Sequence, residues 1–145
     1  MVLAGLIAGI FAGAILLLLA HIAPYIGAGN YVSDIGRVSV LGQQITEREG
    51  QIMGILVHLM TSAGFGAIYA ELVQHQYSPD FTFLGIMSWC LFITIVVAVI
   101  ILPISGKGFF GVKEDPWFSI DLFITNVGWG VLYWFLVPLW LKILI

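Results

Sequence analysis

Two histidines, His21 and His58, are the residues of this sequence best suited to bind a cofactor. His21 comes near the end of the first apolar segment, and His58 lies a few turns into the second, which must return from the same side. At about 1.5 Å per residue, two antiparallel helices could hold these rings within roughly 10 Å of the same depth. Such a pair could ligate a b-type haem axially, or bind a quinone head group or a metal. The alternative is structural, with each neutral ring hydrogen-bonded to a nearby carbonyl or hydroxyl group.

The other reactive side chains do not form a catalytic set. No acid follows Ser62 and His58 at a position that would complete a Ser-His-Asp arrangement, and metal-ligand spacings such as HxxxH and CxxC are absent from the sequence. Glu71 and Asp121 lie near the ends of apolar segments, where water can solvate them. Cys90 is typical of a small buried residue. We therefore expect no catalytic residue and no metal site.

The composition indicates which kind of structural element holds these residues. Of the 145 residues, 61% are hydrophobic and 9% are charged, whereas a soluble domain is about 25% charged. This deficit excludes a soluble enzyme and a disordered chain. A net charge of -3 without a basic patch also argues against binding of nucleic acid.

Four apolar runs have the length of about 20 residues that spans a bilayer. The sequence therefore predicts an all-α integral membrane protein with a single membrane domain, 1–145, and four transmembrane helices. The expected spans cover about residues 2–23, 47–74, 79–102 and 116–137.

Capping residues and prolines mark the ends of these spans. Thr46 and Glu49 form a capping box at the start of the second span. Ser78-Pro79-Asp80 and Asp115-Pro116 combine a capping side chain with a proline in the first turn, which predicts the starts of the third and fourth spans. Prolines are expected to end or bend the helices at Pro103 and Pro138.

The second and fourth spans share an internal repeat. Residues 64–73 and 128–137 are identical at five of ten positions, and Pro24-x-x-Gly27 matches Pro103-x-x-Gly106. The chain therefore looks like two tandem hairpins, 1–77 and 78–145, related by a pseudo-two-fold axis along the membrane normal. With these motifs, it is similar to uncharacterised small four-span prokaryotic membrane proteins. This resemblance implies the four-span fold and assigns no functional site.

Small residues mark the faces along which the helices pack. Helices in lipid associate by close van der Waals contact, which small residues allow. Such contacts could form within the chain or against a partner, and the sequence does not distinguish the two. The candidate packing positions are Gly5, Gly9 and Gly13 on the first span, Ser62, Gly66 and Ala70 on the second, and Gly128 and Gly130 on the fourth.

The basic residues predict the orientation of the chain. Arg37, Arg48, Lys107 and Lys113 all lie on the side of the first and third loops. By the positive-inside rule, loops 28–45 and 104–115 are cytoplasmic and both termini lie outside, in the plasma (inner) membrane of a prokaryote. Residues 28–45 could form a short interfacial helix or an irregular loop.

Three functions are compatible with this pattern. We favour a non-catalytic accessory or structural subunit of a larger membrane complex, such as a respiratory or other energy-converting one, because no carboxylate lies in the middle of a span. The partners would be the surrounding lipids and either other membrane subunits or further copies of the chain. The alternative is a small electron-transfer protein that binds haem b or quinone through His21 and His58. The third is a small transporter or channel lined by the polar residues Thr61, Ser62, Thr125 and Asn126.

Overall fold

The computed structural model describes residues 1–22, 47–78, 80–104, 106–113 and 118–144. Within these ranges the chain is helical: α1 spans Val2–Ile22, α2 spans Glu47–Gln74, α3 spans Phe83–Val96, and α5 spans Phe118–Leu144. A π-helical segment, Val97–Ile101, and the short helix α4, Leu102–Ile104, extend α3. Four helices are each long and apolar enough to cross a membrane: Val2–Ile22, Gln51–Gln74, Phe83–Ile104 and Phe118–Leu144.

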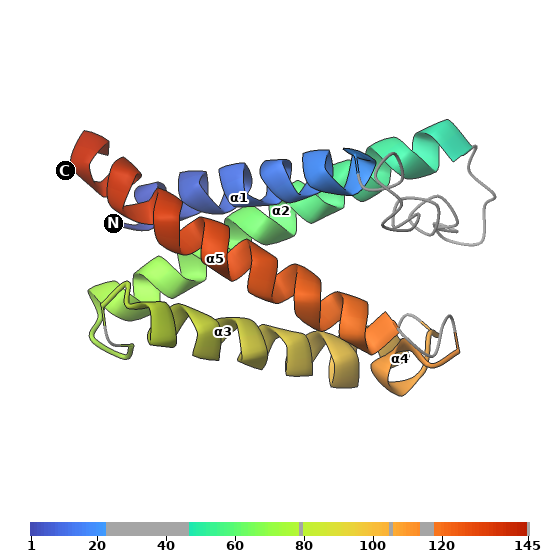
Figure 1. Cartoon of the computed structure of the whole chain (residues 1–145). Coiled ribbons are helices and arrows are strands. Elements are labelled where there is room, and N and C mark those ends of the chain that lie inside the picture. Colours follow the sequence, from blue (N-terminus) through green and yellow to red (C-terminus); the bar gives the residue numbers. More distant parts are fainter. Residues whose placement is uncertain (23–46, 79, 105, 114–117, 145) are drawn as a thin grey trace.

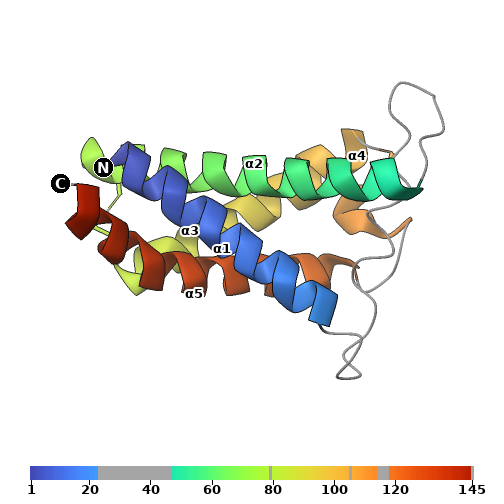
Figure 2. The same ribbon diagram turned by 90° about the horizontal axis from the view of Figure 1, so that it is seen from above.

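The four helices form a bundle in which not all neighbouring pairs pack along their length (Figure 1). Both termini lie at the same end as the turn between α2 and α3, and α4 lies at the opposite end. α1 packs against α2 and α5, and α3 packs against α5. By contrast, α2 and α3 approach each other at their connecting turn and then diverge. The view from above shows α1 crossing obliquely between α2 and α5 (Figure 2).

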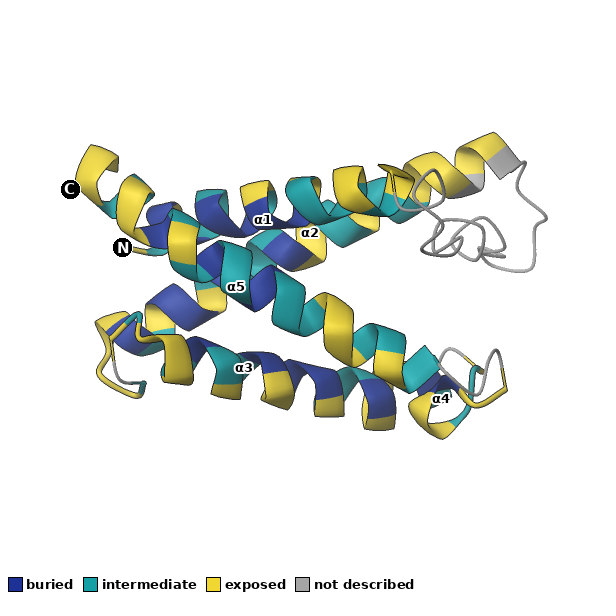
Figure 3. Ribbon diagram, viewed as in Figure 1, coloured by how far each residue is buried: buried dark blue, intermediate teal, exposed yellow. Residues whose placement is uncertain are grey.

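Aromatic residues fill the centre of the bundle. Tyr69 of α2 and Tyr133 of α5 are fully buried, and their rings meet edge to face with centroids 6.2 Å apart. Trp129 stacks on Tyr133 at 4.8 Å. Buried residues lie on the facing sides of the helices and exposed residues on the outer sides (Figure 3). Edge-to-face and offset contacts are the favoured arrangements of aromatic rings, so this cluster fixes how α5 lies against α2.

The start of α3 differs from the expectation based on Ser78-Pro79-Asp80. The helix begins at Phe83, and the side chain of the preceding Thr82 accepts a hydrogen bond from the Gly85 amide at 3.2 Å. Ser78 still belongs to the end of α2, because its amide donates to the Leu72 carbonyl, and its hydroxyl donates to the Tyr69 hydroxyl at 3.3 Å. Thr82 therefore caps α3 in its place.

The third helix ends at Ile104, one residue after Pro103 and close to the predicted end of the third span near residue 102. Pro103 lies within α4 and follows the π-helical segment, in which the Leu102 amide donates to the Val97 carbonyl five residues back. The fourth helix extends beyond the expected end at residue 137, since α5 continues through Pro138 to Leu144. A proline removes one hydrogen bond of the helical ladder, and long apolar helices tolerate this loss when neighbouring groups compensate.

Several expectations concern positions that the structure does not describe. They are the Thr46 cap, the interfacial helix within 28–45, the Asp115-Pro116 cap and the Pro24-x-x-Gly27 motif.

Candidate functional site

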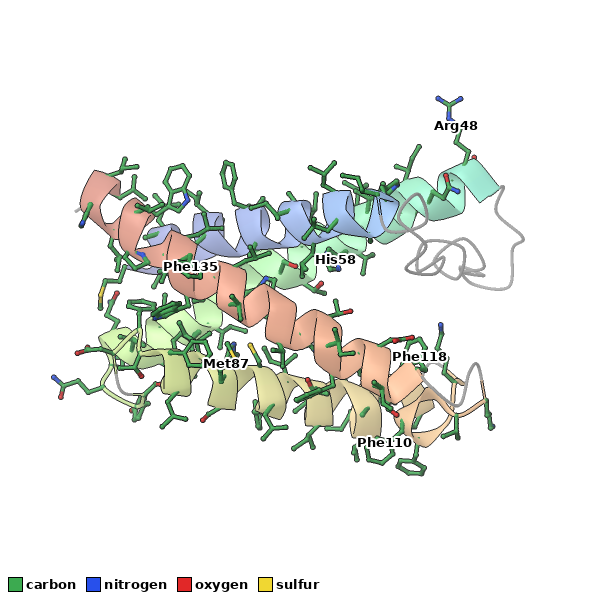
Figure 4. All side chains as sticks on the ribbon, in the orientation of Figure 1. Arg48, His58, Met87, Phe110, Phe118 and Phe135 are labelled. Carbon is green, nitrogen blue, oxygen red and sulfur yellow. The ribbon has the colours of Figure 1, made fainter. Side chains whose placement is uncertain are left out.

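His58 lies where α1 and α2 cross. A Cβ atom placed on Gly13 would stand 3.6 Å from its Cδ2 atom, so the imidazole packs against the α1 backbone. Its Nε2 atom is buried and has no hydrogen-bond partner in the part of the chain that the structure describes. In Figure 4 the side chain lies in the middle of the bundle, whereas Arg48 projects away from the far end of α2.

His21 has different surroundings from His58. It is exposed, and its Nδ1 atom lies 2.9 Å from the carbonyl oxygen of Leu17 in its own helix. His21 follows Gly13, the α1 residue beside His58, by eight residues, which is about 12 Å along a helix at 1.5 Å per residue. His21 thus contacts its own helix, about two turns along α1 from the place where the imidazole of His58 packs.

The glycine row of α1 faces the small-residue row of α2. A Cβ on Gly5 would stand 2.5 Å from both the Ala70 Cβ atom and the Gly66 carbonyl oxygen, and a Cβ on Gly13 would stand 2.5 Å from the Ser62 hydroxyl oxygen. A Cβ on Gly9 would overlap the Ser62 carbonyl. The two rows thus contact each other within one chain, where only small residues permit such close backbones.

The two candidate glycines of α5 contact different helices. Gly130 packs against α3, where an added Cβ would overlap the Cys90 sulfur and come within 2.8 Å of the Met87 Cε atom. A Cβ added to Gly128 would stand 3.3 Å from the Leu16 Cδ2 atom of α1. Figure 4 shows Met87 on the side of α3 that faces α5. These positions explain how α5 packs against both α1 and α3.

Two hydrogen bonds from α5 to the glycine crossing were not anticipated from the sequence. The Tyr133 hydroxyl donates to the Gly66 carbonyl oxygen at 2.9 Å, and the Trp129 indole N–H donates to the Gly9 carbonyl oxygen at 3.4 Å. Both aromatic residues lie in the repeated segment, and so does Tyr69. Their placement inside the repeat is the signal that could have identified them as central.

The polar residues considered for a transport path do not surround a common space. Asn126 donates to the Thr94 hydroxyl at 2.9 Å, and Thr94 donates to the Cys90 carbonyl at 2.8 Å, so Asn126 links α5 to α3. Ser62 faces α1 on another side of the bundle. Thr61 donates to the Val57 and His58 carbonyls of its own helix, and Thr125 is exposed.

Comparison with protein-family models, with curated proteins and with solved structures finds no match to this chain. Over the described ranges, no group of three or more His, Cys, Asp or Glu side chains lies close enough to hold a metal ion. The choice among the candidate functions therefore depends on how the side chains of the bundle are used.

Proposed function

We propose that this protein is a non-catalytic accessory or structural subunit of a larger membrane complex, such as an energy-converting one. The observation that carries this proposal is that polar side chains inside the helices serve helix packing. Tyr133, Trp129 and Asn126 each donate a hydrogen bond to a neighbouring helix. Ser62 is buried against the glycine row of α1. A catalyst or carrier would instead direct such groups toward a ligand.

The outer faces of the helices support the same role. Large apolar side chains are exposed on every long helix, among them Leu18, Met60, Leu84, Ile124 and Phe135. In a bilayer these faces contact lipid or the apolar helices of neighbouring subunits.

The proposal includes insertion in the plasma membrane of a prokaryote. The end of α1 at Ile22, the start of α2 at Glu47 and the short helix α4 lie at the same end of the bundle (Figure 1), which supports the orientation predicted from the sequence. Arg48, Lys107 and Lys113 belong to that side, which the positive-inside rule makes cytoplasmic. Both termini then lie outside.

We also propose that the bundle arose from two tandem hairpins. Tyr69 and Tyr133 are equivalent in the repeat, and the two buried rings meet at the centre of the bundle. Gly66 and Gly130 are equivalent too, and each lies against the other helix of its hairpin. The copies have since diverged, because α1 packs against α5 whereas the equivalent helices α3 and α2 diverge.

The test is the fate of membrane complexes after deletion of the gene. Native membranes from wild-type and deletion strains would be extracted in mild detergent and separated by native electrophoresis. We expect one complex to lose abundance or size in the deletion strain and to recover when the gene is restored. The proposal fails if the protein extracts as a monomer and every complex stays intact without it.

A second candidate, binding of haem b or quinone, is favoured by one observation. The imidazole of His58 interacts with the Gly13 backbone, but its buried Nε2 atom makes no hydrogen bond of regular geometry within the described ranges, and a ligand would satisfy that atom. The absorption spectrum of the native preparation distinguishes this candidate. A Soret band that disappears in His58→Ala would support haem binding, and a band that survives this change would exclude His58 as a ligand. For quinone, extraction and chromatography of the bound lipids replace the spectrum.

A further inference from the structure

A groove runs along the region where α2 and α3 diverge from their connecting turn. Its volume is about 670 Å³, within the range of about 300–1,000 Å³ that is usual for ligand sites. Ten residues line it: Tyr69 and Leu72 of α2, Tyr77, Ser78 and Thr82 of the turn, and Leu84, Gly85, Ser88, Trp89 and Phe92 of α3. On the other side of the bundle, α1 and α5 pack against each other.

The groove changes from polar to apolar along its length. Tyr77, Ser78 and Thr82 stand at the turn, and Leu84, Trp89 and Phe92 follow along α3. Phe92 comes ten residues after Thr82, which is about 15 Å along a helix. This distance equals the hydrocarbon thickness of one leaflet, since the hydrocarbon core of a bilayer is about 30 Å thick. The polar end would thus lie at the head groups and the apolar part beside the acyl chains.

The charges around the polar end match a zwitterionic head group. Asp80 lies in the turn between two lining residues and is exposed, and Glu71, paired with His75 at 2.9 Å, lies one turn before the end of α2. These carboxylates favour an ammonium group. These exposed acids disfavour a head group with a net negative charge, whereas the amino end of α3 favours the phosphate that a zwitterionic head group also carries.

We propose that this groove binds one phospholipid with a zwitterionic head group. The acyl chain lies along Leu84, Trp89 and Phe92, and the ammonium group lies beside Asp80. This inference is independent of the accessory role, because it concerns a lipid site that the chain would carry as a monomer or within a complex.

The test measures which lipid the full-length protein retains. The protein is reconstituted in vesicles of equimolar phosphatidylethanolamine and phosphatidylglycerol, extracted in mild detergent and analysed by native mass spectrometry. We expect one retained phospholipid per chain, with phosphatidylethanolamine enriched about threefold over the vesicle ratio, the effect expected of one exposed charge pair. Retention of detergent alone, or preferential retention of phosphatidylglycerol, would overturn the proposal.

Two variants separate the groove from general lipid contact. Ser88 is exposed and lines the groove, so Ser88→Trp should fill it and abolish retention, whereas Ile124→Trp on the exposed face of α5 should retain the lipid like wild type. Asp80→Asn should keep the lipid and lose the threefold preference. Circular dichroism checks that each variant folds. Unchanged retention in Ser88→Trp, or equal loss in Ile124→Trp, would refute the site.

Discussion

The close crossing of α1 and α2 makes a sharp prediction about two glycines of one helix. A Cβ added to Gly66 would overlap the Gly5 carbonyl oxygen and stand 3.1 Å from the Gly9 Cα atom and 3.0 Å from the Tyr133 Cε2 atom. The first two neighbours are backbone atoms, which no side-chain rotation can move away. At Gly64, two residues earlier, an added Cβ meets nothing within 4 Å. Gly66→Ala and Gly64→Ala are therefore the same substitution in two opposite environments.

The expected magnitudes follow from these contacts. Overpacking a close-packed site costs about 1–3 kcal/mol. Separating α1 from α2 also weakens the hydrogen bond that Tyr133 donates to the Gly66 carbonyl, and such interhelical bonds contribute about 0.6–1.7 kcal/mol in membranes. We expect Gly66→Ala to lower the free energy of unfolding by about 2–3 kcal/mol. Gly64→Ala should leave it unchanged or raise it by up to about 1 kcal/mol, because alanine is the better helix former.

The assay is reversible unfolding in mixed micelles by titration with sodium dodecyl sulfate, followed by far-ultraviolet circular dichroism. The reasoning is refuted if Gly66→Ala is as stable as wild type, or if Gly64→Ala destabilises the protein to the same extent.

Three further predictions use the same unfolding assay. Tyr133→Phe removes only the buried hydroxyl and should cost about 0.6–1.7 kcal/mol, while Tyr77→Phe, at a residue that is 82% exposed, should cost nothing measurable. Asn126→Ala should lower the free energy of unfolding about as much as Tyr133→Phe, because it breaks the hydrogen bond between α5 and α3. The exposed control Thr125→Ala should leave it unchanged. Equal losses of stability in the two variants would contradict this role of Asn126. Gln76→Gly should stabilise the chain by up to about 1 kcal/mol, because Gln76, two residues after the end of α2, has a φ of 60°, a conformation in which glycine is less strained. A loss of stability would argue against this strain.

The positions of the four helices follow from the lengths of the apolar segments, which can be read directly from the sequence. The small-residue rows were also visible in it, because Gly5, Gly9 and Gly13 recur at helical spacing. That these rows face Ser62, Gly66 and Ala70 could not be deduced. A row of small residues indicates that something approaches closely, and it does not say whether the neighbour belongs to the same chain.

The histidine pair shows why the site was harder to predict than the helices. His21 and His58 were aligned by depth alone, but contact also depends on the direction in which each side chain leaves its helix. His21 bonds to its own helix, and His58 packs on Gly13. The hydrogen bond that the Tyr133 hydroxyl donates to Gly66 cannot be predicted from local spacing, since it joins residues that are 67 positions apart.

The π-helical segment Val97–Ile101 has a consequence for the phase of α3. The buried residues of α3 are Ile86, Cys90, Ile93 and Thr94. Counted from Cys90 at 3.6 residues per turn, an unbroken α-helix would return to this face near residues 97 and 101. The buried positions are instead Ala98 and Leu102. A π turn holds one residue more than an α turn, so the segment behaves as a single-residue insertion absorbed inside the helix. The inserted residue turns the remainder of the helix by about 100°. The residues that face the bundle after the insertion are therefore one position later in the sequence, and the buried face stays continuous to the end of the helix.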